Sequence, residues 1–400
     1  MKLLNERRRY VYPRLLLATI AVSGILYFPV AWTIRARDGH HYGNDFAVFW
    51  SAASLAEEGD APNAYDIARL HARETSVTPE IQVFPWHYPP QFLVMLLPLA
   101  LLPYAAALAA WELVTGGLFL LACRPVVNAR RWAGVSACAL PAVLMALGFG
   151  QNGFLTAGLL GGGLLALDNR PVMAGGLIGL LSYKPHFAPL AFVALLAGRR
   201  WRALGAAVSS AALLALASLA VLGWDTWRAF RADLPLSAEA LDDPSGWKKM
   251  PTLYAAVRLA GGGPTLARVL QVLVALSVAG AVAWLWRRGR HSEHRSAAVA
   301  IGAVVASPYA FVYDLPLAAL AMGWLFRATE GQSWRLWERA TVAGVALLPV
   351  AAWPLAALSG VQVGPLVLGA FFVLVLRRAR ETRRVGAEAT LTAGGGVRLP

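Results

Sequence analysis

Five polar side chains beside or within apolar segments have the residue types to do chemistry together. Asp45 follows the first apolar segment, and Asp314 lies inside a later one. A carboxylate of this kind can take a proton from a hydroxyl group. Lys184 interrupts another apolar segment, and its ammonium group could balance the charge of a phosphate. Gln151 and Asn152 lie in a glycine-containing turn, where their amides could bind sugar hydroxyls.

Each of these residues also has a structural interpretation. Asp45 could cap a helix that starts one residue later. Gln151 and Asn152 could serve the turn alone, and Lys184 could extend its charge to the membrane surface. Asp314 is harder to explain in this way, because an unpaired aspartate at membrane depth is costly and is by default functional.

Four aromatic or histidine side chains next to these positions extend the candidate set. His186 follows Lys184 and Pro185 and could assist with a phosphate, although a lone histidine more often makes a structural hydrogen bond. The sequence Tyr88-Pro89-Pro90 predicts an extended lead into an apolar segment. Its rigidity could position His87 and Tyr88, while Tyr309 follows a proline that breaks a later apolar block.

No pattern in the chain indicates a metal or a cofactor. There is no Ser-His-Asp spacing, no phosphate-binding glycine loop, no zinc pattern and no Asp-x-Asp pair. The two cysteines, Cys123 and Cys138, have no partner motif, so we interpret them as inert buried thiols. We therefore expect catalysis, if there is any, from side chains alone.

The composition predicts a membrane protein. The 400 residues are 58% hydrophobic and 14% charged, with a mean hydropathy of +0.54, whereas a soluble protein of this length needs more polar surface. The apolar blocks are long enough to cross a hydrocarbon core of about 30 Å. The net charge of +14 comes largely from arginines clustered between those blocks. Such clusters mark cytoplasmic loops, and this placement disfavours nucleic-acid binding.

The elements that must position the candidate residues are therefore membrane helices. We predict an all-α bundle of about 10–12 spans in one domain, 1–380, with a disordered cytoplasmic tail, 381–400. The first span is expected near 15–34, followed by a long extracytoplasmic loop, 35–88, with an interfacial helix near 46–58. Polar residues and prolines break the blocks 171–198 and 296–327, which indicates chain that lines a cavity or meets protein.

The arginine clusters also predict the orientation. Both termini are assigned to the cytoplasm, and the candidate residues to the extracytoplasmic side of the plasma (inner) membrane. The block 89–122 decides one part of this assignment. If it formed two full spans, the turn at 150–152 would move to the cytoplasmic side.

Several short motifs occur in a particular order along the chain. They are Asp45-Phe46 with Trp50, Tyr88-Pro89-Pro90, Gly150-Gln151-Asn152, Lys184-Pro185, and Ser307-Pro308-Tyr309 with Tyr313-Asp314. In order and spacing this set resembles glycosyltransferase family 87, within the GT-C superfamily of membrane glycosyltransferases. The resemblance extends over residues 10–380, although each motif alone is short.

The resemblance implies a function. Such enzymes take a sugar, often mannose, from a polyprenyl-phosphate carrier and transfer it with inversion to an extracytoplasmic lipid or glycan acceptor. An acidic residue of the first external loop acts as the base, which corresponds to Asp45. The well-studied mannosyltransferases of the family have a histidine-containing motif near the position of 307–314. This chain has no histidine there, which leaves the sugar and the acceptor open.

Combining the residue chemistry with the resemblance assigns a role to each candidate. Asp45 is the expected catalytic base, and Lys184 with His186 is expected to bind the donor phosphate. The remaining candidates are expected to bind the sugar or the acceptor: His87, Tyr88, Gln151, Asn152, Tyr309 and Asp314. The expected partners are a polyprenyl-phosphate-linked sugar, a lipid or glycan acceptor and membrane lipids.

Two other classes of function fit part of the pattern. A multi-span transporter or lipid flippase would also place Lys184 and Asp314 in a cavity, but the long acidic first loop and the lack of a repeated half disfavour it. A non-catalytic scaffold for envelope assembly would tolerate replacement of the polar residues at membrane depth.

Overall fold

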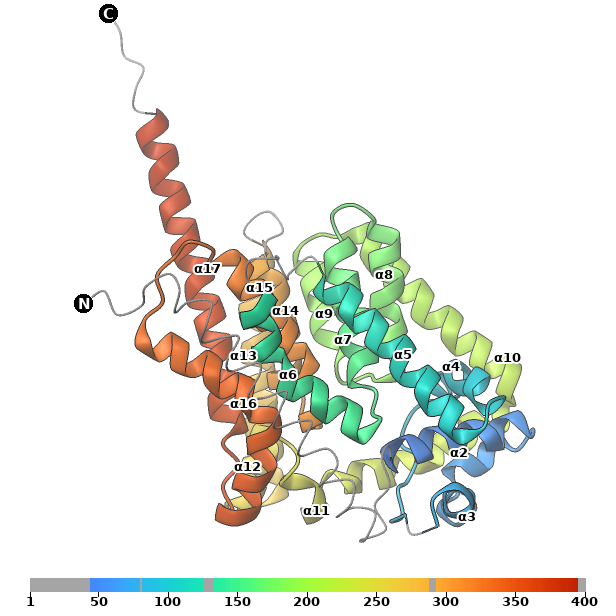
Figure 1. Ribbon diagram of the computed structural model, residues 1–400. Helices are drawn as coiled ribbons and strands as arrows, with labels where there is room; N and C mark the ends of the chain where they lie inside the picture. The colour runs from blue at the N-terminus through green and yellow to red at the C-terminus, as the bar shows by residue number, and fades with distance from the viewer. Residues whose placement is uncertain (1–43, 80, 125–131, 288–292, 395–400) are drawn as a thin grey trace, which may run out of the picture.

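The computed structural model describes residues 44–79, 81–124, 132–287 and 293–394. Within these ranges the chain forms α-helices and short 3-10 helices and no strand, so the predicted all-α fold is confirmed (Figure 1). The first span expected at 15–34 lies outside the described residues.

Helices make up most of the described chain. In chain order they are α2 (Asn44–Glu57), η1 (Ala61–Tyr65), α3 (Ile67–Val77), α4 (Pro90–Ala100), α5 (Tyr104–Cys123), α6 (Trp132–Phe149), α7 (Gly153–Ala166), α8 (Pro171–Leu180), η2 (Leu181–Tyr183), α9 (Ala188–Ala197), α10 (Trp201–Ala240), α11 (Pro244–Trp247), α12 (Leu253–Leu259), α13 (Pro264–Arg287), α14 (Glu293–Ala306), η3 (Val312–Asp314), α15 (Pro316–Ala328), α16 (Leu336–Ser359) and α17 (Gly364–Gly394).

Four of the described helices are long and apolar enough to cross a membrane: α5, α10, α13 and α16. Less than half of each apolar window is buried within the protein, and α10 is the extreme case with 11% of its window buried. An apolar helix surface that no protein covers suits hydrocarbon rather than water. These exposed faces support a membrane location for the bundle.

A second set of apolar helices is too short to cross a bilayer alone. The helix α7 has 14 residues, and α8 and α9 have 10 each. At 1.5 Å per residue, 14 residues rise only about 21 Å, against a hydrocarbon core of about 30 Å. The breaks predicted in blocks 171–198 and 296–327 are confirmed, because α8 ends before α9 and α14 ends before α15.

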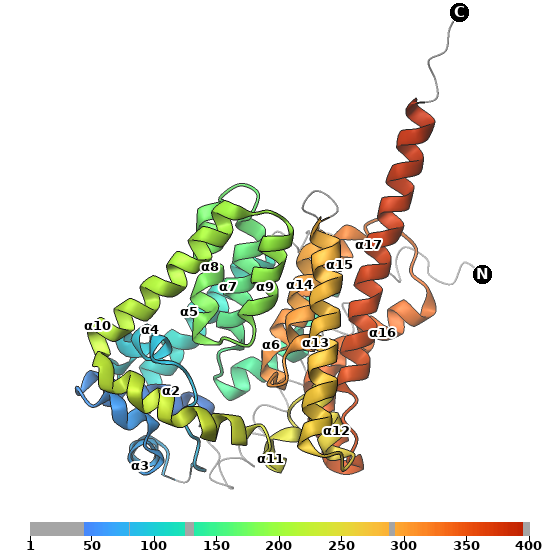
Figure 2. The ribbon, with the colours of Figure 1, turned by 180° about the vertical axis from the view of Figure 1, so that it is seen from behind.

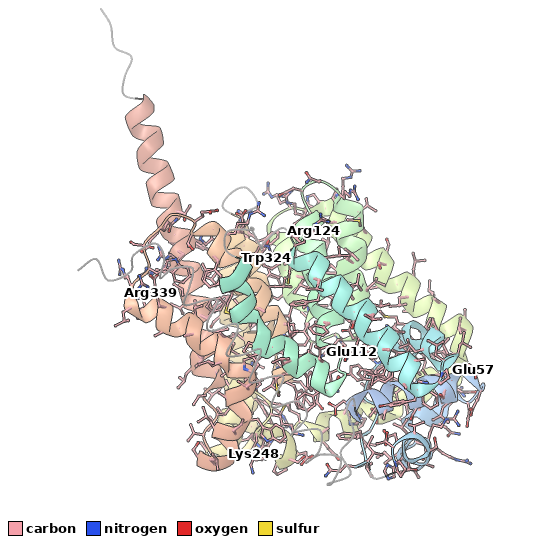
Figure 3. The ribbon with its side chains drawn as sticks, viewed as in Figure 1. Glu57, Glu112, Arg124, Lys248, Trp324 and Arg339 are labelled. Atoms are coloured by element: carbon pink, nitrogen blue, oxygen red, sulfur yellow. The ribbon has the colours of Figure 1, made fainter. Side chains whose placement is uncertain are left out.

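The two ends of the bundle differ in composition (Figure 3). Arg124 and Arg339 lie at one end, here called the arginine end, and Lys248 lies at the opposite end. The helices α2, α3, α11 and α12 gather at that opposite end (Figure 1). Short helices thus cover one end of the bundle, and Arg124 and Arg339 mark the other (Figures 1 and 3).

The block 89–122 does not form two full spans. It folds into the 11-residue α4 and the 20-residue α5, joined by a turn at 101–103. The indole Nε1 of Trp50 donates a hydrogen bond of 3.0 Å to the carbonyl oxygen of Leu102, which places this turn against α2. The helix α5 then runs toward the arginine end, and α6 returns from it (Figure 1). The turn at 150–152 therefore lies on the same side of the bundle as α2.

The helix predicted at 46–58 is confirmed as α2, but its apolar face packs on protein rather than on lipid. Phe46 and Phe49 are fully buried, and both rings contact Trp111 of α5, with centroids 6.2 and 5.7 Å apart. Trp50 packs edge-to-face on Tyr104. This aromatic contact fixes the start of α2 relative to α5, which a helix lying only in the membrane interface could not achieve.

The helix α10 bends where it leaves the bundle. Gly223 has φ of 77° and ψ of 171°, so the helical run is broken there. The part after the bend crosses the opposite end, where the ring of Phe230 lies 5.9 Å from that of Tyr65 in η1, measured between centroids (Figure 2). Beyond the bend the chain stays helical to Ala240.

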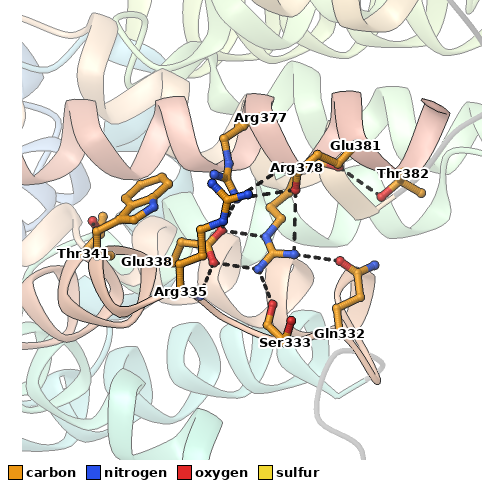
Figure 4. Close-up of polar contacts among 10 residues, drawn as sticks. Gln332, Ser333, Arg335, Glu338, Thr341, Arg377, Arg378, Glu381 and Thr382 are labelled. Atoms are coloured by element: carbon orange, nitrogen blue, oxygen red, sulfur yellow. Dashed lines mark hydrogen bonds and ion pairs between the residues drawn. The ribbon is translucent and has the colours of Figure 1, made fainter. Parts of the chain in front are cut away.

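A buried ion-pair network holds the arginine end together (Figure 4). Arg378 of α17 donates to both carboxylate oxygens of Glu338, at 2.8 and 2.7 Å, and also to Gln332 and to the carbonyl of Ser333. Arg377 donates to the same carboxylate at 2.7 Å. The helix α17 continues from this network to Gly394, through most of the stretch expected to be a disordered tail.

Candidate functional site

The candidate residues gather where the short helices end. Gln151 and Asn152 lie between α6 and α7, and Lys184 follows η2 at the end of α8. Asp314 closes η3, between α14 and α15. Segments that are far apart in the sequence thus bring polar groups to one place in an otherwise apolar bundle.

Glycine makes this close approach possible. Gly150 has φ of +67°, the left-handed conformation that favours glycine in a tight turn. A Cβ atom on Gly153 would lie 1.8 Å from the carbonyl oxygen of Tyr313. The start of α7 can therefore lie against the turn that carries Asp314 only because residue 153 has no side chain.

Asn152 is the centre of the hydrogen-bond network. Its side chain is fully buried, and its Nδ2 donates to the hydroxyl of Tyr88 at 2.9 Å. Its Oδ1 accepts from the Nζ of Lys184 at 2.7 Å. Its backbone carbonyl accepts from Thr156 at 3.0 Å and from Tyr183 at 3.4 Å. One amide thus joins three segments that the sequence keeps apart.

Lys184 and Asp314 form a buried ion pair. The Nζ of Lys184 lies 2.5 Å from Oδ1 of Asp314, and the two side chains are 4% and 0% exposed. The other carboxylate oxygen of Asp314 accepts from the backbone N–H of Phe311 at 3.0 Å. A lysine ammonium has three protons, and two of them are used by Asn152 and Asp314. The third has no hydrogen-bond partner among the described residues, and the ammonium also lies 5.1 Å from the ring centroid of Phe187.

Asp45 joins the same network through Gln151. The Nε2 of Gln151 donates to Oδ2 of Asp45 at 3.0 Å, and its Oε1 accepts from the N–H of Asn152 at 3.4 Å. Asp45 is half-buried and lies in the first turn of α2. We call the six residues linked in this way the polar cluster: Asp45, Tyr88, Gln151, Asn152, Lys184 and Asp314.

Aromatic rings support Tyr88 from behind. Its ring lies 5.7 Å from that of Phe49, 5.1 Å from Trp86 and 4.9 Å from Phe92, measured between centroids. The hydroxyl of Tyr65 donates to the backbone carbonyl of Tyr88 at 2.9 Å. Burial raises the pKa of the Tyr65 phenol well above its usual range, so this group remains a donor.

His87 does not join the polar cluster. Its Nδ1 lies 3.0 Å from Oδ2 of Asp233 and 2.9 Å from the hydroxyl of Ser237, both on the part of α10 that follows the bend. Because side chains alternate along an extended segment, Trp86 and Tyr88 face the aromatic core while His87 faces α10. Its Nε2 is buried and has no partner among the described residues.

His186 and Tyr309 lie beside the polar cluster without a hydrogen bond to it. Their rings are 6.0 Å apart, and the Nε2 of His186 has no partner in the part of the chain that the structure describes. Tyr309 begins a row of alternating aromatic residues. Its ring lies 5.1 Å from Phe311, which stacks at 5.1 Å on Tyr313.

Several residues at the site received no role in the sequence analysis, including Tyr313, which was named only as part of a motif. Tyr183 and Thr156 share a hydrogen bond of 2.6 Å beneath Asn152. Tyr313 lies 5.5 Å from the Nζ of Lys184, measured to the ring centroid, and within electrostatic range of Asp45. The alternating aromatics at 309, 311 and 313 were the sequence signal that could have identified Tyr313.

Metal binding has no support within the described ranges, where no group of three or more His, Cys, Asp or Glu side chains could hold an ion. The chemistry available is that of a half-buried carboxylate, a buried lysine, amides and phenols. This set can remove a proton from a hydroxyl group and bind sugar or phosphate oxygens.

The comparison with protein families identifies the chain. A family model described as glycosyltransferase family 87 matches residues 86–308, more than half of the sequence. The chain belongs to glycosyltransferase family 87. No curated protein and no solved structure matches it. The match confirms the family predicted from the order of the motifs.

The protein is therefore a glycosyltransferase with membrane helices. Of the polar cluster, Tyr88, Gln151, Asn152 and Lys184 lie within the matched region of family 87. Asp45 and Asp314 lie outside it, on either side, and only the fold brings them to the matched residues.

Proposed function

We propose that this family 87 glycosyltransferase transfers a hexose, mannose-like, from a polyprenyl-phosphate carrier to an extracytoplasmic lipid or glycan acceptor, with inversion. One observation carries the proposal. Asp45 is held by Gln151 at the place where short membrane helices end, and it is linked through Asn152 to the buried Lys184. A carboxylate and a proton-donating cation joined in this way suit a reaction that takes a proton and releases an anion.

Asp45 acts as the general base in this proposal. The side-chain amide of Gln151 donates to the Asp45 carboxylate at 3.0 Å and so orients it. The helix that carries it is held by Phe46 and Phe49, which are 0% and 1% exposed. A fixed, half-buried carboxylate is what general-base catalysis requires of a side chain.

In the transfer step one carbon–oxygen bond forms, one carbon–oxygen bond breaks and one proton moves. The acceptor oxygen attacks the anomeric carbon and forms the new carbon–oxygen bond while its proton passes to Asp45. The bond between the anomeric carbon and the phosphate oxygen breaks on the opposite side. The electron pair leaves with polyprenyl phosphate, and single displacement inverts the anomeric centre.

The other candidates bind the two substrates. Lys184 contributes its third proton to an oxygen of the donor phosphate, and His186 adds its unpartnered Nε2 nearby. Tyr88, Gln151, Asn152 and Asp314 shape the sugar side of the site, with Tyr309 at its edge. His87, which is held by Asp233, contacts the acceptor at the boundary with α10.

Product formation tests the proposal directly. The purified full-length protein in detergent is incubated with radiolabelled polyprenyl-phosphate sugars and a lipid extract, and the lipids are then separated. We expect a new labelled product from one sugar, lost in Asp45→Asn. Wild-type protein that yields no product from any labelled sugar, but moves labelled lipid across vesicles, would instead support a flippase.

The orientation has its own test. Cys123 and Cys138 are first replaced by serine, and single cysteines are then placed at the exposed positions Asp243 and Arg202. An impermeant maleimide should label intact cells at 243 and not at 202. Labelling at 202 alone would reverse the proposed orientation and place the polar cluster on the cytoplasmic side.

A further inference from the structure

The charge of Lys184 is already balanced within the protein. Its ammonium lies 2.5 Å from the Asp314 carboxylate, and both side chains are buried. It can offer one proton to a ligand, but the pair as a whole is neutral. A polyprenyl-phosphate donor brings a negative charge to the site, and the departing phosphate gains another. A second cation near the polar cluster would therefore stabilise the bound donor and the departing phosphate.

Lys249 lies on a loop that is fastened to this region. Its carbonyl oxygen accepts from the backbone N–H of Val312 at 3.1 Å, two residues before Asp314. The preceding carbonyl, of Lys248, accepts from Gln362 at 3.2 Å. A Cβ atom on Gly364 would lie 2.3 Å from the Cβ of Pro251, so the loop also packs directly against the start of α17.

The ammonium group of Lys249 contacts an aromatic ring and not a carboxylate. Its Nζ lies 5.0 Å from the ring centroid of Trp353 in α16. Among the described residues it makes no ion pair. Contact with the ring face attracts the cation and removes part of its water without cancelling its charge. Lys249 is also half-buried, whereas its neighbour Lys248 is exposed.

We propose that Lys249 binds the phosphate anion of the lipid-linked donor and, after transfer, of the polyprenyl-phosphate product. The assignment rests on the proposed function, because it requires a phosphate-linked donor. A lysine suits this role, since a compact ammonium can follow a phosphate whose charge changes during the reaction. Lys184 then donates one hydrogen bond from a neutral pair, and Lys249 supplies the net positive charge.

The loop itself provides a matched control. Lys248 and Lys249 are adjacent, carry the same charge and share the loop between α11 and α12. Only Lys249 contacts Trp353. General attraction of an anionic lipid to a basic surface would use both residues, whereas a phosphate site would use Lys249 alone.

The experiment measures equilibrium binding of radiolabelled polyprenyl monophosphate to the full-length protein in neutral-lipid nanodiscs. Lys249→Gln should weaken binding about tenfold or more, the effect of losing one charged hydrogen bond. Lys249→Arg should retain part of the affinity, and Lys248→Gln should bind like wild type. Neutral polyprenol of the same chain length should bind all four proteins equally, which also reports that each is folded.

Three results would overturn the assignment. Lys249→Gln could bind polyprenyl monophosphate as tightly as wild type, or Lys248→Gln could lose as much affinity as Lys249→Gln. Inorganic phosphate could displace the labelled lipid at equal concentration, which would make free phosphate the ligand. Failure of the proposed function is distinguishable, because the wild type would then bind polyprenyl monophosphate yet form no glycosylated product.

Discussion

Two buried ion-pair networks in this bundle differ in how completely their groups are paired. At the arginine end, Arg378 makes four hydrogen bonds, and both carboxylate oxygens of Glu338 are bound. In the polar cluster, Lys184 uses two of its three protons, and Asp45 is half-buried beside Gln151.

We interpret this difference as the one between a structural network and the proposed functional site. The Glu338 carboxylate accepts four hydrogen bonds and Arg378 uses four of its five N–H groups. This network therefore has little left for a ligand, and it fastens α16 to α17. Lys184 keeps one proton without a hydrogen-bond partner among the described residues, and the polar cluster draws its groups from several elements, as we propose for a substrate site. Burial and charge alone would not distinguish the two networks. The number of hydrogen bonds that each charged group makes does distinguish them.

The largest expected effect falls on Asp45. Asp45→Asn should fold and bind donor like wild type, because an amide oxygen can still accept from Gln151, yet turnover should fall roughly 100-fold to 10,000-fold. Turnover and thermal stability are measured on the same preparation. Asp243→Asn, an exposed carboxylate at the same end, is the matched control. Full activity in Asp45→Asn would exclude it as the base and leave Asp314 as the next candidate.

Stability should respond most at Glu338. Glu338→Gln leaves Arg377 and Arg378 without a carboxylate, and removal of one partner from a buried pair costs about 3–5 kcal/mol. Denaturant or thermal unfolding in detergent measures the loss. Turnover per folded molecule should stay unchanged at low temperature. Glu381→Gln, whose carboxylate is 40% exposed beside the same arginines, should change little. Equal losses in both variants would contradict a closed structural network.

A double-mutant cycle tests the pair inside the polar cluster. Lys184→Met and Asp314→Asn should each destabilise the protein, while the double variant should recover part of the stability, with a coupling of about 1–3 kcal/mol. Activity should remain low in all three proteins. Recovery of activity in the double variant would show that the pair serves the fold alone.

The smallest expected effect is at Tyr183. Tyr183→Phe removes the hydroxyl that shares a hydrogen bond of 2.6 Å with Thr156, at a cost of about 1 kcal/mol. A thermal scan measures this change, with turnover recorded beside it. Turnover should fall less than threefold, because neither hydroxyl belongs to the polar cluster. A loss as large as that of Asp45→Asn would extend the functional network to Tyr183.

The residues of the polar cluster were easier to predict from the sequence than the helices that carry them. Lys184 and Asp314 were recognisable because charges interrupt apolar segments there. Their pairing was not, since 130 residues separate them. Hydropathy also could not separate α7, α8 and α9 from full spans, because it measures composition and not how far a helix travels.

His87 shows a second limit of the sequence. The motif Tyr88-Pro89-Pro90 correctly indicated an extended segment. The alternation of side chains along it directs His87 away from Tyr88. Asp233 was not among the candidates, because it belongs to none of the motifs that the sequence analysis used. Only the continuation of α10 beyond Gly223 brings Asp233 to His87.

The close packing at Gly153 limits which substitutions the protein can accept there. Any larger side chain there would meet the carbonyl oxygen of Tyr313, at 1.8 Å for a Cβ atom, and would displace the turn that carries Asp314. A saturation library scored only by product yield would therefore place Gly153 among the least replaceable positions, together with Asp45. A parallel score for folded protein would tell them apart, since Gly153 variants should fail both scores and Asp45→Asn only the first.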